Sequence, residues 1–407
     1  LQPTTPCRDS SRPRRVLRSI PDRLPDPPVP KALQMARPGG RNRAQSSSVN
    51  VLGARLRDTC FIPPESMGAV GPTQFIVAVN GRIRSFDKVS GAQDAILDVT
   101  TDIFFTSAKT PVGGLVAQNA GASDPRIRFD AGTQRWYTVM IDVPLDSGGN
   151  FRPNRVMIAV SDTAAISATT NWTFFFFTPS PNFIDYPMLG IDNNALYIGA
   201  NIFNLPGTAF VNTDAYVVQK SSIQGAGPIV ATAFTGLVSD VNCTTPSANG
   251  PYAPMGTDNR NIATEGYFIG VSFCNFGQLV MRRVINPGSA SPTISADIIV
   301  NTANFLFADT MPHLGNTQGA GGKLDASDTR LISAQVRNGV LYSAHAISVD
   351  TAGAATANAA VARNGVRWYQ LNGLTTATPG VLDSGTVFDP TATDPQTTDV
   401  KWYSYPG

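Results

Sequence analysis

The sequence is poor in charge. Charged residues make up 15% of the 407 residues, histidine occurs 2 times, and Glu65 and Glu265 stand isolated. Long surface helices favour Lys and Glu, so their scarcity argues against a helical protein. The 36 Gly, the 31 Pro and many Thr, Val and Asn residues suit short strands joined by turns. We therefore expect an all-β fold.

Long apolar runs are also missing. No run of about eighteen apolar residues occurs, so no segment is expected to span a bilayer. The four phenylalanines of Phe174 to Phe177 predict a buried strand instead. Because the chain starts at Leu1 rather than Met, we interpret it as a processed product whose signal peptide is gone. We expect it to be secreted, or held at the cell surface.

Basic residues are concentrated at the start of the chain. Residues 1–50 hold ten Lys/Arg against Asp9, Asp22 and Asp26, and the remainder is mildly acidic. Arg and Pro without hydrophobic periodicity predict an extended arm, residues 1–50, ahead of a folded body, residues 51–407. The arm could also lie against an acidic surface. The body has no basic stripe with interleaved aromatics, so we expect no nucleic-acid partner.

Four cysteines occur without a CxxC pair, which disfavours a zinc site. In an oxidising compartment they predict two disulfides, Cys243–Cys274 within one repeat and Cys7–Cys60 between arm and body. Asn171 and Asn242 begin N-glycosylation triplets, which matter only in a eukaryotic source.

A proline-led element recurs through the body, at steps of 53, 62, 67, 58 and 94 residues. Its six copies are Gly71-Pro72, Asp124-Pro125, Tyr186-Pro187, Ala253-Pro254, Met311-Pro312 and Tyr405-Pro406. Pro cannot donate to a strand ladder, so it belongs at a strand start or an edge. Steps near sixty residues fit four strands and a loop, the size of a propeller blade. The long last step contains two Gly/Ala-rich insertions, residues 316–322 and 351–362.

We therefore predict a β-propeller of six, or seven, four-stranded blades, the last incomplete at residue 407. A β-sandwich is the alternative, although sandwiches do not repeat a Pro-led strand at this interval. An unclosed propeller exposes apolar faces and strand edges. We expect a second polypeptide, or a cleaved C-terminal segment, to complete the last blade.

Several short motifs resemble those of exported, mostly bacterial β-propeller proteins that are uncharacterised and loosely compared with sialidases. They are Gly68-Ala-Val-Gly-Pro72 with Val79-Asn-Gly-Arg82, Ser123-Asp-Pro-Arg126 with Arg135-Trp136, Asp185-Tyr-Pro187 with Gly190, and Arg337-Asn-Gly339 with Ala344-His345. The resemblance covers residues 60–407 and implies blades rather than a chemistry. In that group the last Tyr-Pro element begins a complete set of blade strands. In this sequence only Gly407 follows Tyr405-Pro406.

Candidate ligand or channel-lining residues lie at the repeat starts, where innermost strands would meet. They are Asp124, Arg126, Asp185, Tyr186, Asp309 and His313. The three aspartates are weak candidates for binding Ca²⁺, which takes six to eight oxygens. Asp before Pro also caps turns, and Asp124 could simply pair with Arg126 or Arg128. No other cofactor is expected.

No motif identifies a reaction. A sialidase-like hydrolase would need an arginine cluster, a Tyr/Glu pair and an acid. Arginines are available for such a cluster, at positions Arg82, Arg126, Arg155 and Arg330. However, the sialidase Asp boxes are absent, and neither glutamate lies at a repeat start. His313 and His345 have no metal-binding or catalytic spacing.

The favoured interpretation is a non-catalytic binding or structural module of an extracellular or cell-surface assembly, with a protein partner. The alternatives are a glycan-processing hydrolase of sialidase-like architecture and a lectin-like sugar binder. Trp136, Trp172, Trp368 and Trp402 fall within strand patterns, so we interpret them as packing residues rather than a carbohydrate platform.

Overall fold

The computed structural model describes residues 49–112, 115–116, 121–205, 207–245, 249–313, 322–390 and 400–406. The predicted arm, Cys7 and hence the Cys7–Cys60 pairing lie outside these residues, apart from positions 49 and 50. Within them, no helix is long and apolar enough to cross a membrane.

Five antiparallel sheets follow one another along the chain. Blade 1 comprises β1 (Met67–Val70), β2 (Gln74–Val79), β3 (Arg82–Asp87) and β4 (Gln93–Val99). Blade 2 comprises β7 (Gly121–Asp130), β8 (Arg135–Val143), β9 (Val156–Ser161) and β10 (Trp172–Phe177). Blade 3 comprises β11 (Phe183–Ile191), β12 (Ala195–Phe203), β13 (Phe210–Gln219) and β14 (Ala231–Phe234).

Blade 4 comprises β15 (Pro251–Gly256), β17 (Glu265–Ser272), β18 (Gln278–Ile285), β19 (Thr293–Ile294) and β20 (Ile298–Asn301). Blade 5 comprises β21 (Ser333–Arg337), β22 (Val340–Val349), β23 (Arg363–Asn372) and β24 (Gly380–Val387). The connections hold α1 (Leu56–Thr59), α2 (Thr101–Phe104), the 3₁₀ turn η1 (Lys220–Ile223), the short pair β5 (Pro111–Val112) and β6 (Leu115–Val116), and β16 (Asp258–Asn259). β16 adds to β21 in parallel.

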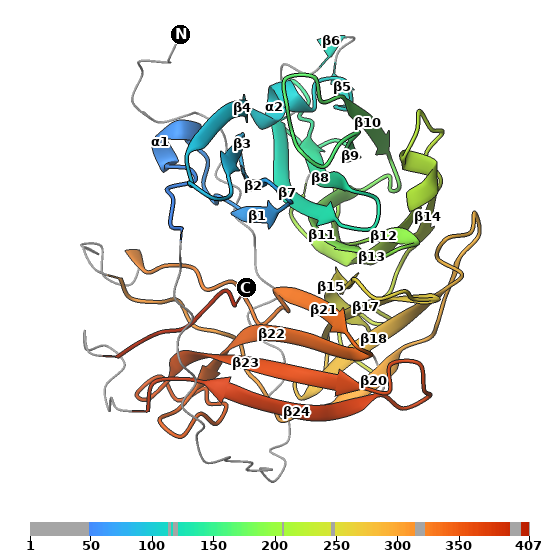
Figure 1. The fold of residues 1–407 in the computed structure, drawn as a ribbon. Coiled ribbons are helices and arrows are strands. Elements are labelled where there is room, and N and C mark those ends of the chain that lie inside the picture. Colours follow the sequence, from blue (N-terminus) through green and yellow to red (C-terminus); the bar gives the residue numbers. More distant parts are fainter. Residues whose placement is uncertain are drawn as a thin grey trace.

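The first strands of successive blades pack against one another, as inner strands do in a propeller. Blades 1 to 3 form the upper half of Figure 1, and blades 4 and 5 form the lower half. The all-β propeller prediction is thus confirmed, but the predicted six or seven blades are wrong, because the described residues form five. The sixth Pro-led element forms no strand, and the long last step holds one blade whose inner strand begins at Ser333.

Bulges explain three of the proline-led elements. In β7, β11 and β15 the register shifts where the Pro stands. The preceding residues Asp124, Tyr186 and Ala253 have φ values of +57°, +54° and +44°. Pro removes a ladder hydrogen bond and disfavours helical backbone before it, so the extra residue bulges. Bulges re-aim side chains, here at the middle of the propeller.

Glycine allows β15, the inner strand of blade 4, to approach β12, the second strand of blade 3. A Cβ placed on Gly199 would stand 1.7 Å from the carbonyl oxygen of Pro254, and one on Gly256 would stand 2.1 Å from that of Tyr197. Only residues without a side chain permit this backbone approach.

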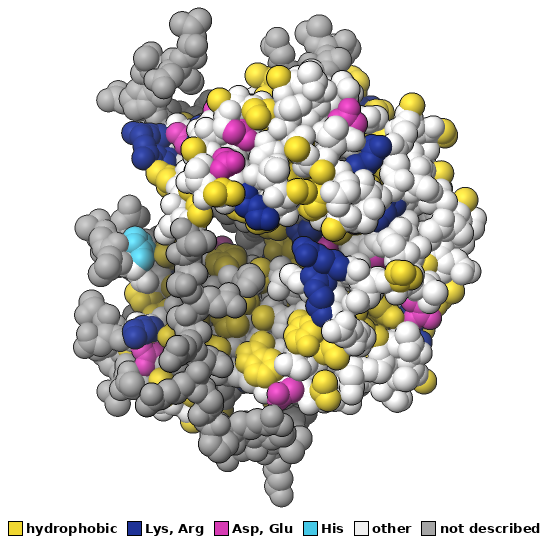
Figure 2. All heavy atoms as spheres, in the orientation of Figure 1, with side chains coloured by type: hydrophobic (Ala, Val, Ile, Leu, Met, Phe, Trp, Pro, Cys, Tyr) yellow, Lys and Arg dark blue, Asp and Glu magenta, His cyan; other side chains and the backbone are white. Residues whose placement is uncertain are grey.

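Core clusters join blade 1 to 2, 2 to 3, 3 to 4 and 4 to 5. Among the described residues, no such cluster joins blade 5 to blade 1. Figure 2 shows a hollow between the two halves, with hydrophobic side chains in its lower wall. In the part of the chain that the structure describes, the ring of blades is therefore open on one side.

Two smaller predictions can be compared with the structure. Cys243 and Cys274 form the predicted disulfide, with Cα atoms 5.4 Å apart. The phenylalanine run forms β10 as expected, but only partly buried, because β10 is the outer edge strand of blade 2. Phe175 is buried, whereas Phe176 is 40% exposed.

Candidate functional site

Charged and aromatic side chains from different blades meet at the inner strands. We call Glu65, Arg126, Tyr186, Tyr252, Asp328 and Arg330 the central cluster. Glu65 precedes β1, Asp328 and Arg330 precede β21, and the others lie in β7, β11 and β15. Arg126 and Arg330 are 2% and 8% exposed, so their charges need partners inside the protein.

Arg330 is held by Asp328 and Tyr252. Its Nε donates to Asp328 Oδ1 at 2.8 Å, and its Nη2 donates to Asp328 Oδ2 at 2.5 Å. Nη2 also donates to the Tyr252 hydroxyl, which in turn donates to Asp328 Oδ2. This two-pronged pair is the strongest ion-pair geometry available to arginine. Burial opposes ionisation of Asp328, but Arg330 outweighs it and lowers the pKa of Asp328.

Arg126 is paired less tightly. Its Nη2 stands 3.6 Å from Glu65 Oε2, beyond ordinary hydrogen-bond length. Its Nε contacts the Met188 sulfur at 3.2 Å, and its Nη1 donates to the Pro125 carbonyl. The guanidinium centre lies 5.0 Å from the centre of the Tyr186 ring. Arg330 lies 4.3 Å from the same ring, so Tyr186 contacts both cations.

Asp124 links blades 1, 2 and 3. Its backbone N–H donates to Asn80 Oδ1 at 2.8 Å, next to blade 1. Its carboxylate accepts the backbone N–H of Tyr186 at 3.2 Å, in blade 3. Neighbouring Asp185 is 2% exposed in the β11 bulge. The bulges thus place Asp124, Arg126, Asp185 and Tyr186 close to the centre.

The other two sequence candidates lie elsewhere. Asp309 is exposed, and its carboxylate accepts from Ser348 Oγ on β22 at 3.2 Å. His313 is exposed, with Nε2 2.7 Å from the Gly322 carbonyl. In the described part of the chain, no group of three or more His, Cys, Asp or Glu is placed to hold a metal. Ca²⁺ binding therefore stays a prediction.

Sequence reasoning did not place Glu65, Tyr252 or Asp328 at the centre. Glu65 lies outside the repeat starts, although its φ of +44° matches those of the bulge residues. Tyr252 stands one residue before the Ala253-Pro254 bulge. That position was an available signal, because a bulge changes the direction of both flanking side chains.

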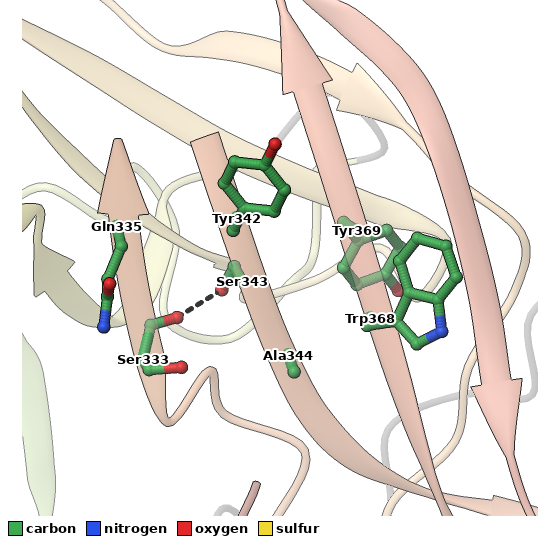
Figure 3. A pocket seen from close by; sticks show the side chains of 7 residues that line it. All are labelled: Ser333, Gln335, Tyr342, Ser343, Ala344, Trp368 and Tyr369. Carbon is green, nitrogen blue, oxygen red and sulfur yellow. Dashed lines mark hydrogen bonds between the residues drawn. The ribbon is translucent and has the colours of Figure 1, made fainter. Parts of the chain in front are cut away.

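Two shallow cavities of about 320 Å³ lie away from the centre. The first is a groove on blade 5, lined by Ser333, Gln335, Tyr342, Ser343, Ala344, Trp368 and Tyr369. Figure 3 shows the ring of Tyr342 on β22 and the indole of Trp368 on neighbouring β23. The second lies between blades 4 and 5.

The sheets and their inner-strand cluster define a five-bladed β-propeller. No protein family known from sequence matches the chain, and no curated protein matches it. Solved structures resemble it loosely. A subtype N10 neuraminidase-like protein of A/little yellow-shouldered bat/Guatemala/060/2010 is 10% identical, covering 79% of this chain and 82% of that one, with a TM-score of 0.38.

Two further structures are similarly distant. The xylan beta-1,4-xylosidase of Bacillus halodurans C-125 is 12% identical over 84% of this chain and 59% of its own, with a TM-score of 0.35. An exo-1,5-alpha-L-arabinanase from a bovine ruminal metagenomic library is 12% identical over 79% and 96%, also with a TM-score of 0.35. At such scores the assignment of the fold rests on the sheets themselves.

Proposed function

We propose that this chain is a non-catalytic binding module of an extracellular or cell-surface assembly, and that the open face of blade 5 is its contact surface. The observation that carries this proposal is the groove around Tyr342 and Trp368, on a face that no core cluster covers among the described residues. Tyr342 is 42% exposed and Val387 on the same face is 48% exposed. Contiguous exposed apolar side chains are typical of interaction sites.

The strand register shows how this face is built. One row across the sheet consists of Gln335, Tyr342, Gln370 and Asp383, and the next consists of Ser333, Ala344, Trp368 and Gly385. The small residues Ala344 and Gly385 on either side of Trp368 leave its indole accessible. The side-chain amides of Gln335 and Gln370 lie on either side of the Tyr342 phenol. The surface combines aromatic anchors with a polar rim, the composition of protein interfaces.

The partner we propose is a polypeptide that presents a β-sheet. A pleated face is covered best by another sheet packed about 10 Å away. Residues 400–406 supply a second argument. Tyr405 precedes Pro406 with φ +50°, the backbone of the inner-strand bulges, yet no strand is formed there. Such a segment suits strand addition by a partner.

The central cluster favours binding over catalysis. A general acid needs a carboxyl with a raised pKa, whereas Arg330 lowers the pKa of Asp328 despite its burial. Burial raises the pKa of Tyr186 and of Tyr252, which keeps both phenols protonated and poorly nucleophilic. The central cluster is therefore better suited to holding neighbouring blades together than to catalysing a reaction.

Native mass spectrometry of the chain isolated from its source tests the proposal. We expect a β-rich polypeptide to co-purify with the chain and to slow amide hydrogen exchange in β22 and β23. The Trp368→Ser variant should no longer bind it. Val89→Ser, at an 83% exposed position on blade 1, is the matched control and should retain the partner. A complex that Trp368→Ser leaves intact, or a chain that travels alone, contradicts it.

A second candidate is glycan processing at the centre, favoured by the convergence of Arg126 and Arg330 with Glu65 and Tyr186. A panel of fluorogenic neutral and acidic glycosides tests it. Turnover abolished by Glu65→Gln in a folded protein would replace the binding proposal. Saturable sugar binding without turnover would instead support a lectin-like role.

A further inference from the structure

The cavity between blades 4 and 5 is independent of the open face. Its lining comes from one rim of both blades: Asn259, Asn261, Ile262, Ala263, Thr264, Glu265 and Tyr267 in blade 4, and Val336, Gly339, Gly373, Leu374 and Thr375 in blade 5. Ile262 is 95% exposed at the edge, whereas Tyr267 is 5% exposed inside. The cavity is a recess where the packing between two blades gives way to polar side chains.

Two opposite charges near this recess have buried atoms without a hydrogen-bond partner among the described residues. Glu265 lines the recess, and its Oε2 is one of these atoms. Arg283 is not a lining residue, but its Nη1 donates to the carbonyl of Thr375, which is, and its Nε and Nη2 are the other atoms. Buried polar atoms without partners are rare in folded proteins and costly to leave so.

The strand register sets the spacing of these two charges. Tyr267 on β17 stands opposite Arg283 on β18, and Glu265 lies two residues before Tyr267. Glu265 and Arg283 are therefore diagonal neighbours on one face, with Cβ atoms about 7 Å apart. The pKa of Tyr267, raised to about 12 by burial and then by Glu265, agrees with a carboxylate close to the phenol.

The wall of the recess is held from both sides. Asn193 of blade 3 accepts the Ala263 N–H at 3.0 Å, and Asn194 donates to the Ala263 carbonyl at 2.8 Å. On the other side, Asn261 accepts the backbone N–H of Asn338, at the β21–β22 turn, at 2.9 Å. The loop before Glu265 is thus tied to blades 3 and 5, which preorganises the recess for a ligand.

We propose that this recess binds a small zwitterion of the α-amino-acid type, with its ammonium on Glu265 and its carboxylate on Arg283. A zwitterion gives each buried charge an opposite charge at hydrogen-bond distance and adds no net charge. A neutral sugar could hydrogen-bond to both groups but would bring no opposite charge to either. A simple anion would satisfy Arg283 but be repelled by Glu265.

Calorimetric titration of the full chain with the standard amino acids tests this proposal. We expect saturable binding of at least one of them, weakened tenfold or more in its deamino and its decarboxy analogue. Glu265→Gln should weaken binding tenfold or more and should abolish the advantage of the ammonium-bearing ligand over the deamino analogue. Arg283→Gln should abolish the preference over the decarboxy analogue.

Arg282→Gln is the control variant. Arg282 is the neighbour of Arg283 on β18 but points to the other face, where Asp297 pairs with it at 2.6 Å. It should bind the amino acid like the parent chain, and far-UV circular dichroism should show every variant folded. Absence of binding by all amino acids overturns the proposal. Equal binding by a folded Glu265→Gln variant, or a preference for glucose or galactose, also overturns it.

Discussion

The two faces of blade 5 are built by alternate residues of the same strands, yet they have opposite surroundings. On β22, Leu341 and His345 are fully buried against blade 4, whereas Tyr342 between them is 42% exposed. On β23, Tyr369 borders the groove but is only 1% exposed and joins the core, whereas Trp368 beside it lies in the row of residues on the open face. Both faces carry large aromatics, so composition alone does not distinguish a core face from a contact face.

Removing the aromatic on the buried face should cost the most stability. Tyr369→Ala deletes a ring packed among Leu341, Leu371 and the other members of the blade 4–5 cluster. It also removes the hydroxyl that lies 3.0 Å from His345 Nε2. We expect the free energy of unfolding to fall by about 4 kcal/mol. Urea denaturation measures it, and a loss below about 1 kcal/mol would show that the two faces are equally open.

Breaking the central cluster should have the second largest effect on stability. Arg330→Met leaves Asp328 buried without its cation, which should cost about 3 kcal/mol of unfolding free energy. Arg330→Met combined with Asp328→Leu should recover most of that loss, because no buried charge then lacks a partner. Chemical denaturation of both variants checks this. If the double variant is as unstable as the single one, packing around Tyr186 rather than charge accounts for the effect.

Part of this arrangement could be predicted from sequence. The Pro-led elements predict a strand-rich repeat because Pro removes a ladder donor. Three of them form bulges, and two of these bulges bring Asp124, Arg126 and Tyr186 inward. Glu65 could not be found this way, because it reaches the centre from outside any repeat start.

The open face could not be predicted either. Tyr342 and Trp368 have the same alternation with polar residues that a strand packed between blades has. Whether a neighbouring blade covers them depends on the three-dimensional closure of the ring. The blade count failed for a related reason: Tyr405-Pro406 has the local backbone of an inner strand without the pairing that makes a blade.

Acid should destabilise the buried face through His345. Its Nδ1 donates to the Thr329 carbonyl, and burial lowers its pKa to about 4. The unfolded chain takes up this proton from about pH 6.5, whereas the folded chain takes it up only near pH 4. Stability from this group is therefore complete above about pH 6.5 and lost progressively between there and pH 4. The loss should reach about 2 to 3 kcal/mol.

Urea unfolding of the parent chain and of His345→Gln, at intervals from pH 7 to pH 4, isolates this contribution. The carboxylates titrate alike in both proteins, so the difference between their unfolding free energies reports His345 alone. We expect this difference to shrink as the pH falls. Parallel curves would mean that His345 has the same pKa in the folded and the unfolded chain, and that the buried face is wetter than its packing indicates.

The open face should show the smallest effect on stability and the largest on binding. Trp368→Ser removes an indole from a groove rather than from a packed core, so unfolding free energy should change by less than about 1 kcal/mol. Urea denaturation of Trp368→Ser and of Tyr369→Ala, measured side by side, compares the two faces at adjacent residues. A loss near 4 kcal/mol for Trp368→Ser would place the indole in a core. The open face would then be a buried surface, and the contact with a β-sheet partner would lose its basis.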